Sequence, residues 1–172
     1  MMKNVLILMV GIPGSGKTTI AKRRASNRDI YISRDEIRFS LLKDGEDYFS
    51  KENLVLKTFI KKINQAIESD KYRFIFADAT HLNKNSRQKI LAHLVTKPAM
   101  TFAMYIDAPL DVAIARNEKR TGRAYVPPKQ IKKMYNSIEI PIKQEGFDVV
   151  FVLDENGNLD FQKSLKVERG EI

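Results

Sequence analysis

The sequence predicts an α/β fold in which about five parallel strands form one sheet with helices on both faces. Two observations lead to this prediction. Short apolar runs of strand length alternate along the chain with longer segments in which apolar residues recur every three or four positions. Such alternation is typical of successive βαβ units, and 172 residues fit a single domain spanning 1–172.

The predicted strands are rich in Val, Ile, Phe and Tyr, as expected where both faces of a parallel sheet are covered. In chain order they are Val5–Val10, Asp29–Ile32, Tyr72–Ala77, Met100–Ile106 and Asp148–Val152. The predicted helices repeat apolar residues at helical spacing, as in Val55, Phe59 and Ile63. They are Lys17–Ser26, Asp35–Leu42, Glu52–Ser69, Asn85–Val95, Leu110–Lys119 and Pro128–Ser137. In the tail, 154–172, the turn signal Glu-Asn-Gly-Asn predicts a small edge hairpin.

Composition excludes several classes of protein. With 43% hydrophobic and 30% charged residues, 8 Gly and 6 Pro, the chain is neither collagen-like nor disordered. Absence of cysteine excludes disulfides and thiolate metal sites, and without a secretory pattern we expect a cytoplasmic protein. The longest apolar stretch, Val5–Val10, is too short for a membrane span, so no membrane partner is expected. A net charge of +9 favours acidic partners such as nucleotides or nucleic acid.

A glycine-rich motif lies between the first predicted strand and the first predicted helix. Residues 11–18 read Gly-Ile-Pro-Gly-Ser-Gly-Lys-Thr and fit G-x-x-x-x-G-K-[ST], a loop whose backbone amides hold phosphates. Lys17 would reach the β- and γ-phosphates of ATP, and the Thr18 hydroxyl would hold Mg²⁺. A plain strand-to-helix turn would need neither side chain. The predicted nucleotide-binding residues of this segment are Gly11, Pro13, Gly14, Ser15, Gly16, Lys17, Thr18 and Thr19.

A phosphate-binding loop alone does not separate switches, motors and kinases. The Asn-Lys-x-Asp element of guanine-specific switches is missing, because Asn83-Lys84 is followed by Asn85 and Ser86. Motor ATPases usually carry an acidic pair at a strand end, but Asp78 is followed by Ala79. These observations favour phosphate transfer to a bound acceptor over hydrolysis.

The helix after the second predicted strand carries a candidate general base. Asp35 and Arg38 lie three residues apart, near the carboxyl edge of the sheet where open α/β sheets bind ligands. Asp35 could accept the proton of an acceptor hydroxyl, and Arg38 could bind a phosphate or orient the carboxylate. The alternative is a capping box formed by Ser33 and Glu36, with Asp35 complementing the helix dipole.

The third predicted strand is followed by Asp78, a carboxylate that must be paired, cap a helix, or contact a metal ion. We expect Asp78 to serve the Mg²⁺ or to pair with Arg38, and Thr80 to offer a polar contact. Its alternative role is to cap the helix that starts at Asn85.

A basic lid, residues 116–135, is predicted from seven Lys or Arg residues against one acid between Arg116 and Lys133. Arg116 and Arg120 lie four apart, so both guanidiniums should project from one helix face. Such arginines can hold the phosphates from the side opposite the glycine-rich loop. For the lysines, an ordinary solvated surface is the simpler interpretation. The loop Thr121–Pro128 is expected to become ordered when it closes over a nucleotide.

Together these segments resemble the kinase domain of phage-type 5′-hydroxyl polynucleotide kinases. The resemblance rests on Gly-x-Pro-Gly-Ser-Gly-Lys-Thr, Ser-Arg-Asp-x-x-Arg, Asp-Ala-Thr-x-Leu-Asn, and Arg-Asn-x-x-Arg followed by Val-Pro and Met-Tyr. It implies that ATP and Mg²⁺ bind at Lys17 and Thr18, and that Asp35 is the base for the 5′-hydroxyl. It also implies that Asp78 supports Arg38, which contacts the acceptor phosphate.

The resemblance further implies that Arg120 clamps the transferring phosphate with Arg116 nearby, and that Arg34 lies beside the acceptor base. Arg123 belongs to the predicted acceptor-binding set, although the lid is about one residue longer than is usual in the family. Many relatives carry a fused 3′-phosphatase with an Asp-x-Asp motif, which this sequence lacks.

The sequence therefore predicts an ATP-dependent kinase of DNA or RNA 5′-hydroxyl ends. The alternatives are a P-loop kinase of a nucleoside, sugar or antibiotic, and a nucleic-acid-stimulated ATPase. The sequence does not indicate an oligomeric state.

Overall fold

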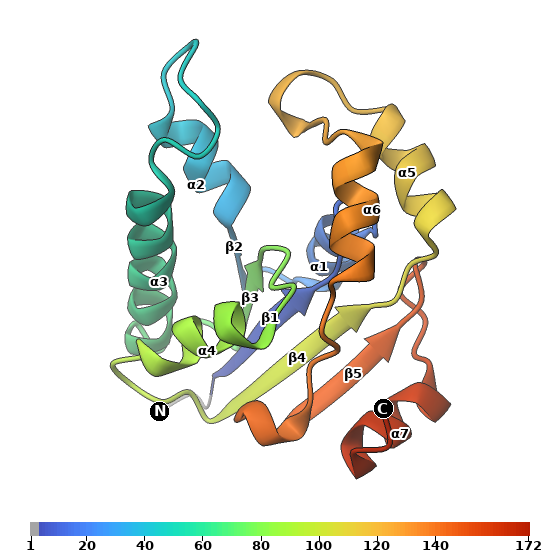
Figure 1. The fold of residues 1–172 in the computed structure, drawn as a ribbon. Helices are drawn as coiled ribbons and strands as arrows, with labels where there is room; N and C mark the ends of the chain where they lie inside the picture. Colours follow the sequence, from blue (N-terminus) through green and yellow to red (C-terminus); the bar gives the residue numbers. More distant parts are fainter. Residues whose placement is uncertain (1–3) are drawn as a thin grey trace.

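A computed structural model describes residues 4–172, so the first three residues of the predicted domain lie outside it. Its centre is one parallel sheet in the order β2-β3-β1-β4-β5 (Figure 1). The strands are β1 (Val5–Val10), β2 (Ile30–Ser33), β3 (Phe74–Asp78), β4 (Met100–Ile106) and β5 (Val149–Leu153). The predicted α/β class, strand number and parallel arrangement are confirmed, with strand ends within two residues of those expected.

Seven α-helices accompany the sheet in the described part of the chain. They are α1 (Lys17–Arg24), α2 (Arg34–Leu41), α3 (Glu52–Glu68), α4 (Lys84–Ala92), α5 (Leu110–Glu118), α6 (Pro128–Asn136) and α7 (Phe161–Arg169). None of the helices described over residues 4–172 has the length and apolar character needed to cross a bilayer.

The tail differs from its prediction. Instead of a hairpin, only one antiparallel bridge, between Leu153 and Leu159, precedes helix α7. Asp160 caps this helix by accepting a hydrogen bond from the Lys163 amide, and Gly170 ends it in the left-handed conformation. These two capping residues were the available sequence signals for α7.

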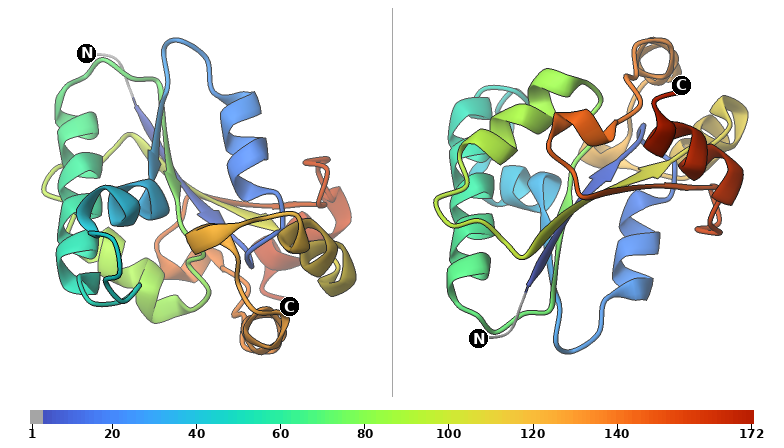
Figure 2. Two further views of the ribbon diagram at one scale, coloured as in Figure 1. Left: turned by 90° about the horizontal axis from the view of Figure 1, so that it is seen from above. Right: turned by 90° about the horizontal axis from the view of Figure 1, so that it is seen from below.

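Alternation along β1 explains why helices cover both faces of the sheet. Leu6, Leu8 and Val10 pack into the core beneath α3 and α4, whereas Ile7 and Met9 face α1 through Ile20 and Ala21. Figure 2 shows α1 on one side of the sheet and α3 and α4 on the other. Because both faces of β1 are buried, this strand is a rigid support for the glycine-rich loop that follows its carboxyl end.

The carboxyl ends of β1, β2 and β3 meet at one edge because the strands are parallel. Asp78, the last residue of β3, is in register with Met9 of β1 and with Ser33 of β2. The glycine-rich loop that follows β1, helix α2 that follows β2, and Asp78 therefore lie at neighbouring positions. From β1 the chain crosses to β2 on one side of the sheet, whereas from β3 it crosses to β4 on the other side. In open α/β sheets, ligands bind at the carboxyl ends of the strands where the connections change direction in this way.

The basic lid stands above the same edge as the antiparallel pair α5 and α6 (Figure 1). A short 3₁₀ helix, Gly122–Ala124, lies within the segment predicted as a loop. Asn117, fully buried, fastens the lid because its side chain bonds both the carbonyl and the amide of Val126, at 2.6 and 3.0 Å. Ile131 of α6 and Ala113 of α5 pack with Ile12 of the glycine-rich loop. The lid is thereby anchored beside that loop.

Candidate functional site

The glycine-rich loop adopts a conformation that two of its glycines make possible. Gly14 has φ of 81°, and a Cβ there would lie 2.2 Å from the Ala113 carbonyl oxygen of α5. Gly16 has φ of 101° at the N-terminus of α1. Side chains at either position would be strained or would push α5 away, so α5 can press directly on the loop.

Lys17 is buried beneath this loop. Its Nζ donates to the Ile12 carbonyl at 2.8 Å, and the side chain is 8% exposed. Burial lowers the pKa of the Lys17 ammonium from 10.5 to about 8; Asp78 and Asp35 oppose this, and Arg120 adds to it. A buried amine of this kind suits an anionic ligand, because an anion bound beside it would stabilise its charged form.

A hydroxyl and a carboxylate meet where the first helix and β3 come together. Thr18 Oγ1 donates to Asp78 Oδ2 at 2.7 Å, and the Tyr31 hydroxyl donates to the same oxygen at 2.5 Å. Oxygen ligands of these two types are those that Mg²⁺ prefers, so the donor set fits this ion. No group of three or more His, Cys, Asp or Glu side chains positioned to hold a metal occurs in residues 4–172.

The expected support of Arg38 by Asp78 is not what the structure shows, since Thr18 and Tyr31 occupy the Asp78 carboxylate. Nor does Asp78 cap α4, because Asn83 accepts the Ser86 amide there. The register between β2 and β3 sets Asp78 beside β1 and β2, whereas Arg38 lies one turn into α2 and points toward α3.

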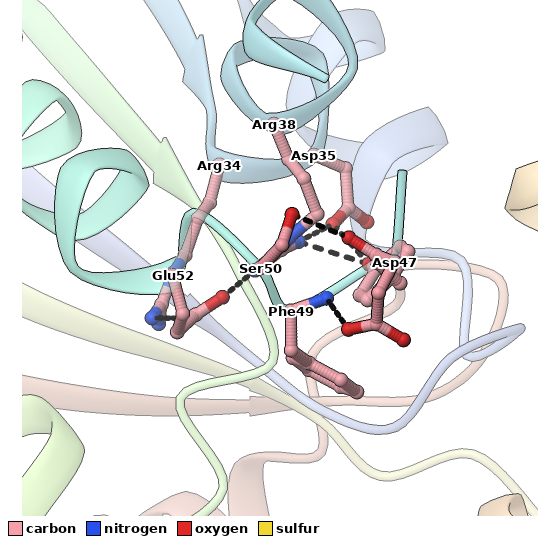
Figure 3. Close-up of polar contacts among 8 residues, drawn as sticks. Arg34, Asp35, Arg38, Asp47, Phe49, Ser50 and Glu52 are labelled. Carbon is pink, nitrogen blue, oxygen red and sulfur yellow. Dashed lines mark hydrogen bonds and ion pairs between the residues drawn. The ribbon is translucent and has the colours of Figure 1, made fainter. Parts of the chain in front are cut away.

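Arg38 is instead held by Glu52, a residue that the sequence analysis did not identify. Glu52, at the start of α3, forms ion pairs with both Arg34 and Arg38 (Figure 3), the second at 2.6 Å. Arg38 also donates to Asp35 Oδ1 at 2.5 Å. An acidic residue in the first helical turn is common for dipole reasons alone, so its sequence position carried no specific signal.

The Ser33–Glu36 interaction of the alternative interpretation is also present. Ser33 Oγ accepts from the Glu36 amide at 3.2 Å and caps α2. Asp35 remains with 63% of its side chain exposed beside this cap. Capping therefore fixes the start of α2 and leaves the Asp35 carboxylate accessible.

Replacing Glu52 by glutamine should destabilise the protein by about 2 kcal/mol, below the roughly 3–5 kcal/mol of a fully buried pair because Glu52 is partly exposed. The change removes the counterion of two guanidiniums whose side chains are 19% and 6% exposed, Arg34 and Arg38. Urea unfolding measures the difference. Glu68→Gln, an exposed carboxylate at the other end of α3, should change stability little. Equal stability of the two variants would contradict this assignment.

The arginines of the lid do not act as one group. Arg116 donates to the Glu155 carbonyl at 2.9 Å and lies against the outside of the glycine-rich loop. Arg123 reaches across to the Lys43 carbonyl at 2.6 Å in the loop between α2 and α3. Arg120 lines the space beside Lys17. Arg116 and Arg120 were expected to reach the phosphates together. Only Arg120 lines the cavity, because the Arg116 guanidinium is hydrogen-bonded to the turn after β5.

A cavity of about 520 Å³ joins most of the predicted residues. Its lining includes Pro13, Lys17, Thr18, Arg34, Asp35, Arg38, Asp78, Thr80, Arg120 and Arg123. The other predicted residues are outside it, namely Gly11, Gly14, Ser15, Gly16, Thr19 and Arg116. Tyr48 and Phe49 of the loop between α2 and α3 also line the cavity, and the sequence analysis had not identified them. The arrangement sets a cation and a phosphate-type loop at one wall and an accessible carboxylate at the other.

Comparison with known proteins supports a kinase-type nucleotide site. A family model described as an AAA domain matches residues 6–141. A putative bifunctional polynucleotide kinase/RNA ligase of Autographa californica nuclear polyhedrosis virus is 28% identical over 144 residues, covering 76% of this chain. The match covers 20% of the viral protein, so the chain spans about a fifth of that relative's length. An adenylate kinase of Campylobacter fetus is 28% identical over 162 residues, covering 78% of this chain and 84% of the relative.

Solved structures agree on the fold. One chain in the structure of the Pnkp1/Rnl/Hen1 RNA repair complex has a TM-score of 0.64 and 25% identity, with 80% of this chain and 44% of that one covered. A sugar kinase from Janibacter sp. HTCC2649 has a TM-score of 0.61 and 18% identity, with 98% and 97% covered, which shows a shared fold alone. Because the family model spans well over half of the residues, the chain belongs to the AAA domain family, within which it has the fold of a P-loop kinase.

Proposed function

We propose that this protein transfers the γ-phosphate of ATP, with Mg²⁺, to the 5′-hydroxyl end of DNA or RNA. One observation carries the proposal. A single cavity has Lys17 and Thr18 at one wall and Asp35 and Arg38 at the other. Phosphoryl transfer needs mainly such positioning and charge stabilisation, because little covalent chemistry falls to the protein.

The donor half of the cavity binds the nucleotide in this proposal. Backbone amides of residues 16–18 and the Lys17 ammonium hold the phosphates, and Thr18 and Asp78 hold Mg²⁺. Bound there, the ion would neutralise charge on the phosphate oxygens. Gly11 contributes by keeping its amide bonded to the Thr80 carbonyl at 3.0 Å, which ties the loop to the end of β3.

ATP binding should be accompanied by proton uptake on the alkaline side of pH 8. In the free protein, burial lowers the pKa of Lys17 to about 8, so much of this amine is neutral there. Anionic phosphates favour the charged amine and raise its pKa again, so a proton enters on binding. Calorimetry in two buffers of different ionisation enthalpy measures this uptake. Lys17→Ala should lose it and Lys22→Ala, on the exposed side of α1, should keep it. Binding without proton uptake would contradict the role of Lys17.

The acceptor half positions the alcohol. Asp35 accepts the hydroxyl proton, and Arg38 orients this carboxylate and offers its remaining surface to an acceptor phosphate. Glu52 keeps Arg38 and Arg34 in place. Arg120 stands beside Lys17 and stabilises charge on the transferring group.

Two features support a polynucleotide acceptor: the positive net charge of the protein and the exposed aromatic side chains that line the cavity. The net charge is +9, and the exposed lysines at 129, 132 and 133 lie along α6 within the lid. Phe49 and Tyr125 line the cavity with 64% and 42% exposure, which suits stacking with a nucleobase. Similarity to a viral polynucleotide kinase/RNA ligase and to a chain of an RNA repair complex points the same way.

A small-molecule acceptor is the second candidate, because the chain covers 84% of an adenylate kinase but only 20% of the viral relative. Incubation with radiolabelled ATP and a panel of nucleosides, nucleotides, sugars and 5′-hydroxyl oligonucleotides separates the two. We expect label on DNA or RNA oligonucleotides, with binding weakened by salt as counterions are released. Label confined to a small molecule would favour the second candidate. Phosphate released only to water would indicate an ATPase.

A further inference from the structure

A hydroxyl of the protein itself is hydrogen-bonded to Asp35, the proposed general base. Tyr48 donates from its phenol to Asp35 Oδ1 at 2.9 Å, and the phenol oxygen itself accepts from Arg38 Nη1 at 2.9 Å. A general base must lie within hydrogen-bond reach of the proton that it removes, and this contact meets that requirement. In residues 4–172, no other hydroxyl forms a hydrogen bond to Asp35.

Local structure keeps Tyr48 in that position. Its ring lies under the Arg38 guanidinium, 4.4 Å from its centroid, and against Phe49 at 4.8 Å. On either side the loop is closed by two contacts. Lys51 Nζ donates to the Leu41 carbonyl at 2.6 Å, and Ser50 Oγ donates to the Asp47 carbonyl at 2.8 Å. The phenol is therefore placed by packing and by loop contacts together.

Tyr48 shares its cavity with the donor residues. Lys17, Thr18 and Arg120 line the same space of about 520 Å³. A triphosphate bound against Lys17 and Thr18 would therefore extend into the cavity that Tyr48 also lines. Burial and the Asp35 carboxylate raise the pKa of Tyr48 to about 12, so the phenol keeps its proton at neutral pH and needs a base to react.

We propose that the protein phosphorylates its own Tyr48 when no external acceptor is present. The bond between the γ-phosphorus and the β,γ-bridging oxygen of ATP breaks, a bond from Tyr48 Oη to that phosphorus forms, the phenol proton passes to Asp35, and ADP leaves. This inference rests on the role of Asp35 in the proposed function.

An external acceptor should suppress the reaction. Its alcohol would compete with Tyr48 for the Asp35 carboxylate, because one carboxylate takes up one proton and each ATP supplies one γ-phosphate. Displacing the Tyr48 hydroxyl would also break the hydrogen bond that it accepts from Arg38. Self-phosphorylation and substrate phosphorylation are therefore expected to compete.

The experiment incubates the full chain with Mg²⁺ and ATP, without an acceptor, and locates phosphate by tandem mass spectrometry. Phosphate is expected on Tyr48, with a fractional rate that does not depend on protein concentration, since each chain modifies itself. Tyr48→Phe and Asp35→Asn should lose it. Tyr135→Phe is the matched control, because Tyr135 is an exposed tyrosine of α6 outside the cavity, and it should keep it.

Adding a 5′-hydroxyl oligonucleotide in the same assay should lower the phosphate on Tyr48 by the fraction of sites that it occupies. If the oligonucleotide is phosphorylated but Tyr48 is unmodified in its absence, this inference is wrong and the proposed function stands. Phosphate on Tyr48 that persists in Asp35→Asn, or phosphate found on another residue, also overturns it. If neither Tyr48 nor any acceptor is phosphorylated, the proposed function fails with it.

Discussion

Replacing Arg120 by alanine should lower the rate of phosphate transfer by about 10³–10⁵-fold, the range typical of an arginine that stabilises the transferring phosphoryl group. Arg120 lines the cavity beside Lys17 and acts on its charge. Of the three lid arginines, Arg116 and Arg123 have carbonyl partners. In the proposed complex, Arg120 is therefore the lid arginine that faces the phosphates. Single-turnover transfer to an oligonucleotide measures the loss.

Stability should not change in this variant, because the Arg120 side chain is exposed. Lys119→Ala removes a neighbouring exposed cation that does not line the cavity, and it should keep nearly full activity. Comparable losses in the two variants would show that general lid charge, rather than Arg120, supports the reaction. Unchanged transfer in Arg120→Ala would remove its assignment.

Replacing Asp35 by asparagine should lower transfer to a 5′-hydroxyl oligonucleotide by about 10²–10⁴-fold, the usual contribution of a positioned general base. Asparagine has the same shape and keeps an oxygen for Arg38, but it cannot take the proton. ATP binding should persist, because in the proposed arrangement the nucleotide binds to the glycine-rich loop and Lys17 rather than to Asp35. Initial rates and nucleotide affinity, measured separately, distinguish these effects.

Glu36→Gln provides the control for Asp35. Glu36 is also exposed in the first turn of α2, but it pairs with Lys22 at 3.0 Å and lies outside the cavity. Its loss should leave transfer almost unchanged. Full transfer by Asp35→Asn would instead require another group to take the proton.

Much of the fold could be predicted because its signals are local. Strands such as Val5–Val10 are continuous apolar runs, and helix α3 repeats its apolar residues at helical spacing. Tail residues 154–172 were harder. The turn at Asp154–Asn158 is present, yet only one bridge follows it before α7 packs Val167 into the core. Whether a turn continues into a hairpin depends on an available edge and on packing, which local sequence does not report.

For the site, chain order predicted which residues gather but not how they pair. Sequence reasoning identified Lys17, Asp35 and Arg120, and one cavity contains all three. It expected Asp78 beside Arg38, but a carboxylate's partner depends on distances between elements far apart in sequence. Glu52 and Tyr48 escaped notice for the same reason, since each is ordinary in its own segment.

By itself, then, the amino-acid sequence determined the parallel α/β sheet and the phosphate-type loop at the end of its first strand. Apolar periodicity and glycine spacing involve residues close together in the sequence, so they can be read without knowing how distant segments pack. Only the tertiary structure decided that Glu52 pairs with two arginines, that Asp78 accepts a hydrogen bond from Thr18, and that Tyr48 donates one to Asp35. Those contacts depend on strand register and on how α3 and the lid lie over the sheet, and both are outcomes of packing the whole chain.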